Sequence, residues 1–88
     1  HKHYSLEKIN EYTTISSILK TVSSYFGVDF VIPENASGNF FLYDNSQHQE
    51  LRSEAEMNTL LLHSEDVNFS LVVWDDEKHT IYIVEYRI

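Results

Sequence analysis

The fold of this chain is decided by residues 67–86. They read VNFSLVVW at 67–74, DDEKH at 75–79 and TIYIVEY at 80–86. Apolar residues alternate with other residues in 67–73 and again in 80–86, on either side of the polar run 75–79. An alternation with period two is the pattern of a β-strand, and a short polar run between two strands is typical of a turn. The stretch therefore predicts a β-hairpin.

Both faces of the predicted hairpin carry apolar side chains. Successive side chains of a strand point to opposite faces, so we expect Ile81 and Ile83 to join Phe69 and Leu71 in the core. The opposite face would then hold a second apolar set: Val72, Trp74, Tyr82, Val84 and Tyr86. Such a face is covered by a helix, by another strand layer or by a partner molecule. The pattern leaves internal packing and partner binding both open.

A helix is predicted over 15–26, upstream of the hairpin. Its apolar residues recur at helical spacing, and they are Ile15, Ile18, Leu19, Val22 and Phe26. Thr13 or Thr14 can serve as the N-cap, and Gly27 suits the left-handed conformation that often ends a helix. This is the strongest helical signal in the chain.

The remaining elements complete an α+β fold in which two helices pack with small β-sheets, in the order β-α-β-β-α-β-β. A short first strand, at the edge of a sheet, is expected near Tyr4 to Ile9. Val28 to Ile32 is rich in β-branched and aromatic residues and ends at Pro33, and Asn39 to Tyr43 follows a turn. Helix formers predominate from Gln49 to His63, which predicts the second helix there.

Length and charge limit the classes of function. Residues 1–88 suffice for one domain, and 42% of them are apolar, too many for a disordered tail. The net charge of −8 opposes binding to nucleic acid and to anionic lipid, and no apolar run approaches the ~20 residues that span a bilayer. No initiator Met or leader is present, so we expect a piece excised from a longer protein.

No motif of catalysis or cofactor binding is found. The chain has no cysteine, only two glycines, and no Gly-x-Ser-x-Gly or His-Glu-x-x-His pattern. His1 and His3, the acidic pair at 65–66 near His63, and the acidic run 75–77 are interpreted as solvated or turn residues rather than metal ligands. We expect no enzyme activity, no catalytic residue, no cofactor and no metal.

The order of elements resembles the short N-terminal (STN) domain of bacterial secretins and TonB-linked receptors. The resemblance is carried by a helix, glycine and apolar strand at 15–32, a glycine-introduced strand at 37–43, and a closing hairpin with strands at 67–71 and 80–84. These segments lie within residues 4–86, and their order and spacing are more specific than any one of them. The interval 44–66 is longer than the family's usual connection and second helix.

The resemblance implies a non-catalytic, protein–protein docking module in the periplasm, part of an outer-membrane secretin of type II or III secretion or of a type IV pilus. Its partners would be protein components of that machine for protein transport, or further copies of the domain in a ring. The alternatives are a signalling domain of a TonB-dependent receptor, the related C-terminal domain of an anti-sigma regulator, and a small-ligand-binding domain.

The partner contacts are predicted on the strand 40–43 and on the hairpin strand 80–86, through edge-strand pairing and packing. The candidate residues are Phe40, Leu42, Tyr43, Trp74, Tyr82, Val84 and Tyr86. The alternative is that these side chains belong to the core and to the inner strands of the sheet. A small-ligand domain would instead form an aromatic pocket from Tyr43, Trp74, Tyr82 and Tyr86.

Overall fold

A mixed β-sheet with two helices defines the fold in the computed structural model, which describes residues 1–30, 38–63 and 66–88. The predicted α+β class and the order β-α-β-β-α-β-β are confirmed. The elements are β1 (Lys2–Leu6), α1 (Ile15–Phe26), β2 (Gly38–Asp44), β3 (Gln49–Leu51), α2 (Glu54–Leu61), β4 (Phe69–Asp75) and β5 (Thr80–Tyr86).

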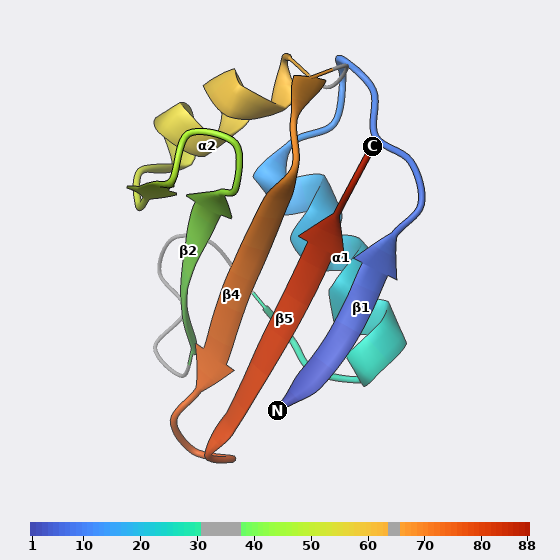
Figure 1. The fold of residues 1–88 in the computed structure, drawn as a ribbon. Helices are drawn as coiled ribbons and strands as arrows, with labels where there is room; N and C mark the ends of the chain where they lie inside the picture. Colours follow the sequence, from blue (N-terminus) through green and yellow to red (C-terminus); the bar gives the residue numbers. More distant parts are fainter. Residues whose placement is uncertain (31–37, 64–65) are drawn as a thin grey trace.

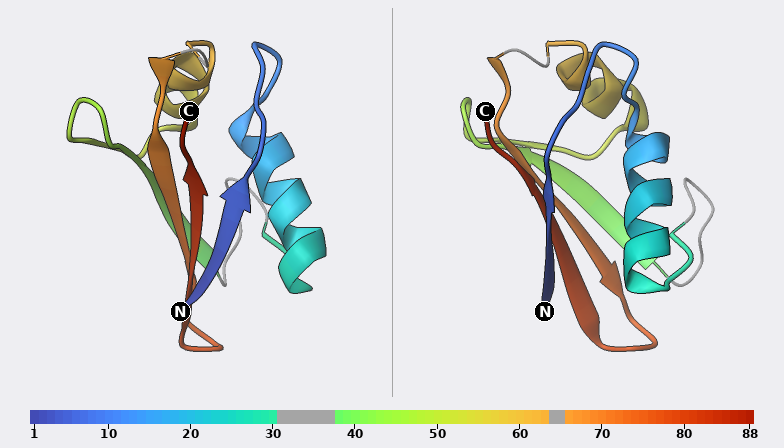
Figure 2. Two further views of the ribbon diagram at one scale, coloured as in Figure 1. Left: turned by 45° about the vertical axis from the view of Figure 1, so that its right-hand side comes forward. Right: turned by 90° about the vertical axis from the view of Figure 1, so that its right-hand side faces the viewer.

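The five strands lie in the order β1-β5-β4-β2-β3. The first strand pairs with β5 in parallel and lies at an edge, whereas all other neighbours are antiparallel. Both helices lie on the same side of the sheet, with α1 behind β5 and β1 and α2 near the end of β4 where that strand begins (Figures 1 and 2). The opposite side of the sheet carries no helix from the described residues.

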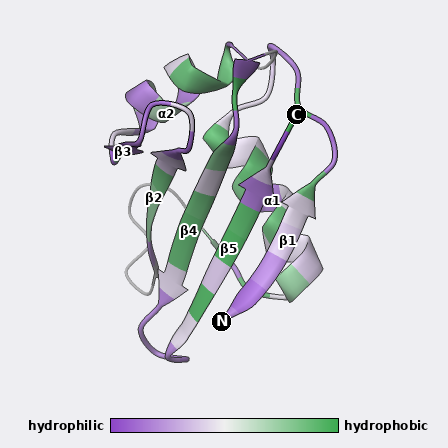
Figure 3. Ribbon diagram, in the orientation of Figure 1, coloured by the Kyte–Doolittle hydropathy of each residue, from purple (hydrophilic) through white to green (hydrophobic). Residues whose placement is uncertain are grey.

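The core fills the space between the sheet and the helices. In the closing hairpin, Phe69 lies opposite Tyr86, Leu71 opposite Val84 and Val73 opposite Tyr82, and all six side chains are buried. The helices contribute the residues that face them: Ile15, Ile18, Leu19 and Val22 from α1, and Met57 and Leu61 from α2. The central strands are accordingly hydrophobic along much of their length, while β1 starts in hydrophilic residues (Figure 3).

The predicted distribution of the hairpin side chains between the two faces was wrong. Ile81 pairs with Trp74 and Ile83 with Val72, on the side away from the helices, whereas Tyr82 lies in the core. Residues that pair directly across two strands share a face. The turn at 76–79 sets Asp75 opposite Thr80, and this register fixes every later pair. Alternation alone could not choose between two sets that are both apolar.

Two of the predicted segments also differ from the structure. Val28 to Phe30 form no strand, because the chain leaves α1 with the Phe30 N–H donating to Ser23 Oγ at 3.0 Å and the Phe30 ring entering the core. The rest of that predicted strand, 31–32, lies outside the described residues. The predicted helix from Gln49 begins only after Ser53, which accepts the Glu56 N–H, and the residues before it form β3.

The two hairpins are closed by the same kind of turn. Asp44 Oδ1 accepts the N–H groups of Ser46 and Gln47, at 2.9 and 3.2 Å, and Asp75 Oδ1 accepts those of Glu77 and Lys78, at 3.0 and 3.4 Å. Each turn ends in a histidine with positive φ, His48 at 56° and His79 at 52°. These bonds account for two buried carboxylates, because a buried polar group needs hydrogen-bond partners. The acidic run 75–77 is thus a hairpin turn.

Helix α1 is capped by its own residues and by α2. Thr14 and Ser17 form a reciprocal capping box, and Gly27 ends the helix at φ 69°. The N–H of Ile15 is bound from elsewhere in the chain, because it donates to Oδ1 of Asn58 in α2 at 2.8 Å. This bond fixes the two helices relative to each other at a partly buried point.

Replacing Asn58 by alanine is expected to lower the free energy of unfolding by about 1–2 kcal/mol, because the Ile15 N–H loses its acceptor. Asn58→Asp is the matched control. It keeps the acceptor oxygen and places a negative charge at the N-terminus of α1, whose first turn has no acidic residue. Urea unfolding should show a loss for the alanine variant only. Equal losses in both variants would contradict the assigned role of this bond.

Candidate functional site: the open face of the sheet

The side of the sheet that bears no helix from the described part of the chain, called the open face below, is not explained by core packing. It is turned toward the viewer in Figure 1. The strand register places its residues in three rows across the sheet: Asn39, Trp74 and Ile81; then Phe41, Val72, Ile83 and His3; then Tyr43, Ser70, Glu85 and Ser5. The first two rows are mostly apolar and the third is mostly polar.

The apolar half of the open face consists of Phe41, Val72, Trp74, Ile81 and Ile83. Ile81 is 45% exposed, and the other four side chains are half-buried by their neighbours on the sheet. The rings of Phe41 and Trp74 meet edge to face, with centroids 6.0 Å apart. The Arg52 guanidinium lies 5.0 Å from the centroid of the Phe41 ring, a cation–π contact worth about 0.5–1 kcal/mol at an exposed site.

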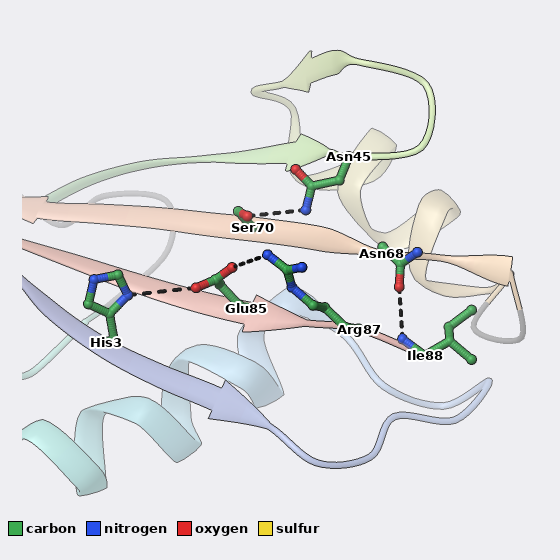
Figure 4. Close-up of polar contacts among 7 residues, drawn as sticks. All are labelled: His3, Asn45, Asn68, Ser70, Glu85, Arg87 and Ile88. Atoms are coloured by element: carbon green, nitrogen blue, oxygen red, sulfur yellow. Dashed lines mark hydrogen bonds and ion pairs between the residues drawn. The ribbon is translucent and has the colours of Figure 1, made fainter.

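The polar half is organised around Glu85, at the other end of β5 (Figure 4). Its two carboxylate oxygens lie 3.7 Å from His3 Nδ1 and 3.2 Å from Arg87 Nη2. Beside it, Asn45 Nδ2 donates to Ser70 Oγ at 3.2 Å. The Ile88 N–H donates to Asn68 Oδ1 at 2.8 Å. These contacts connect four neighbouring strands, β1, β5, β4 and β2, on one surface.

Two shallow concavities flank this polar half. One has a volume of about 330 Å³ and is lined by Asn45, Asn68, Arg87 and Ile88. The other, of about 400 Å³, is lined by Ser5, Leu6, Glu85 and Arg87. Arg87 borders both, and it is exposed. The open face therefore combines an apolar patch with a charged and indented border.

The structure divides the seven residues predicted to contact a partner between the two faces of the sheet. Tyr43 and Trp74 lie on the open face. The others lie on the helix-covered face, where Phe40 packs against the core and the rest are buried: Leu42, Tyr82, Val84 and Tyr86. For these five side chains, the structure agrees with the alternative stated above, that they belong to the core.

Of the two strands predicted to pair at an edge, β5 is an inner strand, and β2 is an inner strand only where β3 pairs with it. β5 lies between β1 and β4, and β2 lies between β4 and β3 over Leu42–Asp44. The aromatic pocket of the small-ligand alternative is not assembled either. Tyr43 and Trp74 lie on one side of the sheet, while Tyr82 and Tyr86 lie in the core on the other.

Sequence reasoning missed Phe41, Ile81 and Ile83 as surface residues. A signal for them was present in the polar residues of the hairpin. Ser70 shares its face with Val72 and Trp74, and Glu85 shares its face with Ile81 and Ile83. The face that admits a serine and a glutamate is the one nearer to water, because a buried carboxylate needs hydrogen-bond partners.

Within the described ranges, no three His, Asp or Glu side chains are grouped so that they could hold a metal ion. Nor is any helix in those ranges long and apolar enough to cross a membrane. No family model, curated protein or solved structure matches this chain.

Proposed function

We propose that this chain is a non-catalytic protein-docking module that binds a partner protein through the open face of its sheet. The observation that carries the proposal is the apolar half of that face, formed by Phe41, Val72, Trp74, Ile81 and Ile83. These side chains come from three adjacent strands, so the patch is held rigidly by the sheet itself.

The arrangement has the composition of a protein interface. Interfaces place aromatic and aliphatic anchors at the centre and charged groups at the rim. Here Trp74 and Phe41 lie among aliphatic side chains. Arg52 lies over the Phe41 ring, and Glu85 and Arg87 lie on the side toward the end of β5. Neither of the two concavities described above is lined by a residue of the apolar half, which favours a protein surface over a small molecule as the partner of that patch.

The resemblance to the short N-terminal domain of secretins supports a more specific role. The proposed setting is the periplasm, in an outer-membrane-associated protein, where the module would dock components of a secretion or pilus-assembly machine. The segments in common with that domain are α1 with its terminal Gly27, strand β2 and the β4–β5 hairpin, whereas the strand expected directly after Gly27 is not formed by Val28 to Phe30. A receptor barrel or a transmembrane helix encoded in the same gene would instead favour the signalling or anti-sigma alternative.

The proposal predicts position-specific crosslinking in cells that produce the natural full-length protein. A photoreactive amino acid at Ile81, on the open face, should yield an adduct with an envelope protein that mass spectrometry identifies. The same amino acid at Lys20, which is exposed on α1, is the matched control and should yield none. Adding Ile83→Glu to the Ile81 variant should abolish the adduct, because it places a charge within the apolar half.

A melting curve for each variant shows whether the domain remains folded. Equal adducts from Ile81 and Lys20 would contradict docking through the open face. An adduct that persists in folded Ile83→Glu protein would contradict it as well. Native mass spectrometry that shows a retained small molecule would favour the ligand-binding alternative.

A further inference from the structure

A groove of about 380 Å³ lies between strand β3 and helix α2, apart from the open face. Its floor is apolar, with Leu51 from β3 and Ala55 and Leu60 from α2. Leu51 is 7% exposed and Leu60 packs against the core, so the floor continues the core to the surface. An apolar side chain placed there would extend the core rather than contact an isolated patch.

The groove runs beside a free strand edge. β3 is the last strand in the sheet and pairs on one side with β2, over Leu42–Asp44. No strand in the described ranges pairs with its other side. An extended segment can add to such an edge through backbone hydrogen bonds, while alternate side chains enter neighbouring pockets. The groove lies where the inward-facing side chains of an added strand would point.

The acidic rim of the groove favours an occupant that carries positive charge. Glu56 is the exposed carboxylate among the residues that line the groove. The described lining residues include one histidine, His63, and no lysine or arginine. No ion pair joins Glu56 to another residue in the described ranges. With a net charge of −8 on the chain, a segment bearing lysine or arginine is complementary to this rim.

We propose that the groove between β3 and α2 binds an extended segment of a partner protein. The segment adds to the sheet beside β3, inserts an apolar side chain between Leu51 and Leu60, and places a lysine or arginine against Glu56. This surface is separate from the open face, so the proposal does not depend on docking there.

The test uses the whole chain and a capped synthetic peptide, Thr-Lys-Thr-Leu-Thr-Lys-Thr, whose leucine and lysines share one face in the extended form. Two control peptides replace both lysines by glutamate or the leucine by serine. Titration followed by amide NMR should shift the signals of Gln49–Leu51 and of Ala55 to Leu60. The two control peptides should bind about five- to tenfold more weakly, because each loses one of the proposed contacts.

Glu56→Lys should weaken binding of the lysine peptide by about five- to tenfold and make the glutamate peptide the better ligand. Glu54→Lys is the matched control, because both residues lie in the first turn of α2 and both changes oppose the helix dipole similarly. Glu54 does not line the groove, so this variant should retain the preference for lysine. A reversed preference cannot arise from partial unfolding.

Several outcomes would overturn the proposal. Equal effects of Glu54→Lys and Glu56→Lys would mean that only the overall charge attracts the peptide. Shifts confined to Val72, Ile83 and their neighbours would place the peptide on the open face. Concentration-dependent shifts of the groove amides without peptide would make a second copy of this chain the occupant. Absence of shifts at millimolar peptide would exclude strand addition.

Discussion

Tyr82→Ala is expected to lower the free energy of unfolding by about 3–5 kcal/mol, the cost of deleting a large buried aromatic side chain. Tyr82 is 2% exposed, and its ring packs against Phe26 and Phe30 with centroids 4.8 and 5.1 Å apart. The ring therefore joins β5 to α1 and to the segment after that helix. Thermal or urea unfolding measures the loss directly.

Ile81→Ala is the matched control, one residue earlier in the same strand. Ile81 is 45% exposed on the open face, so its removal should cost about 1 kcal/mol or less. The two variants also test which face of the hairpin is buried, the one with Tyr82 or the one with Ile81. A larger loss for Ile81→Ala than for Tyr82→Ala would contradict the register of β4 and β5.

Leu61→Ala should lower the free energy of unfolding by about 2–5 kcal/mol, because Leu61 is fully buried where α2 meets the core. Its neighbour Leu62 is 59% exposed. The same substitution there should change stability by about 0.5 kcal/mol or less. The pair holds the chemistry of the mutation constant and varies only the burial, which urea denaturation can compare.

Similar losses at the two positions would contradict the orientation of α2. That orientation also matters for the groove, since Ala55, Glu56 and Leu60 line it only in this rotation of the helix. The difference in unfolding free energy between Leu61→Ala and Leu62→Ala is thus an independent check on the orientation of α2 that the peptide-binding proposal uses.

Several elements could be predicted from local sequence because local interactions determine them. Helix α1 has a capping threonine, an apolar stripe and a terminal glycine, and each acts within one or two turns of the helix. The hairpin is similarly encoded by two alternating segments and an aspartate that binds the turn. Short β3 was missed because three residues carry little periodicity, and its pairing with β2 forms it.

The candidate site was predicted less well than the fold. The structure has Tyr43 and Trp74 on the open face. The other candidates pack in or against the core: Phe40, Leu42, Tyr82, Val84 and Tyr86. Every one of these residues is apolar or aromatic and lies in a strand with apolar side chains on both faces. Residue type could not tell them apart, since both faces offer favourable contacts for such side chains.

The sequence by itself determined the α+β class, the capped first helix and the two-faced apolar hairpin, because those features follow from periodicity and from contacts between near neighbours. Only the tertiary structure decided which face the helices cover, how Asn58 of α2 binds the start of α1, and that β3 is the last strand of the sheet formed by the described residues. Those outcomes depend on strand register and on packing between distant segments, where the chain chooses among several favourable arrangements.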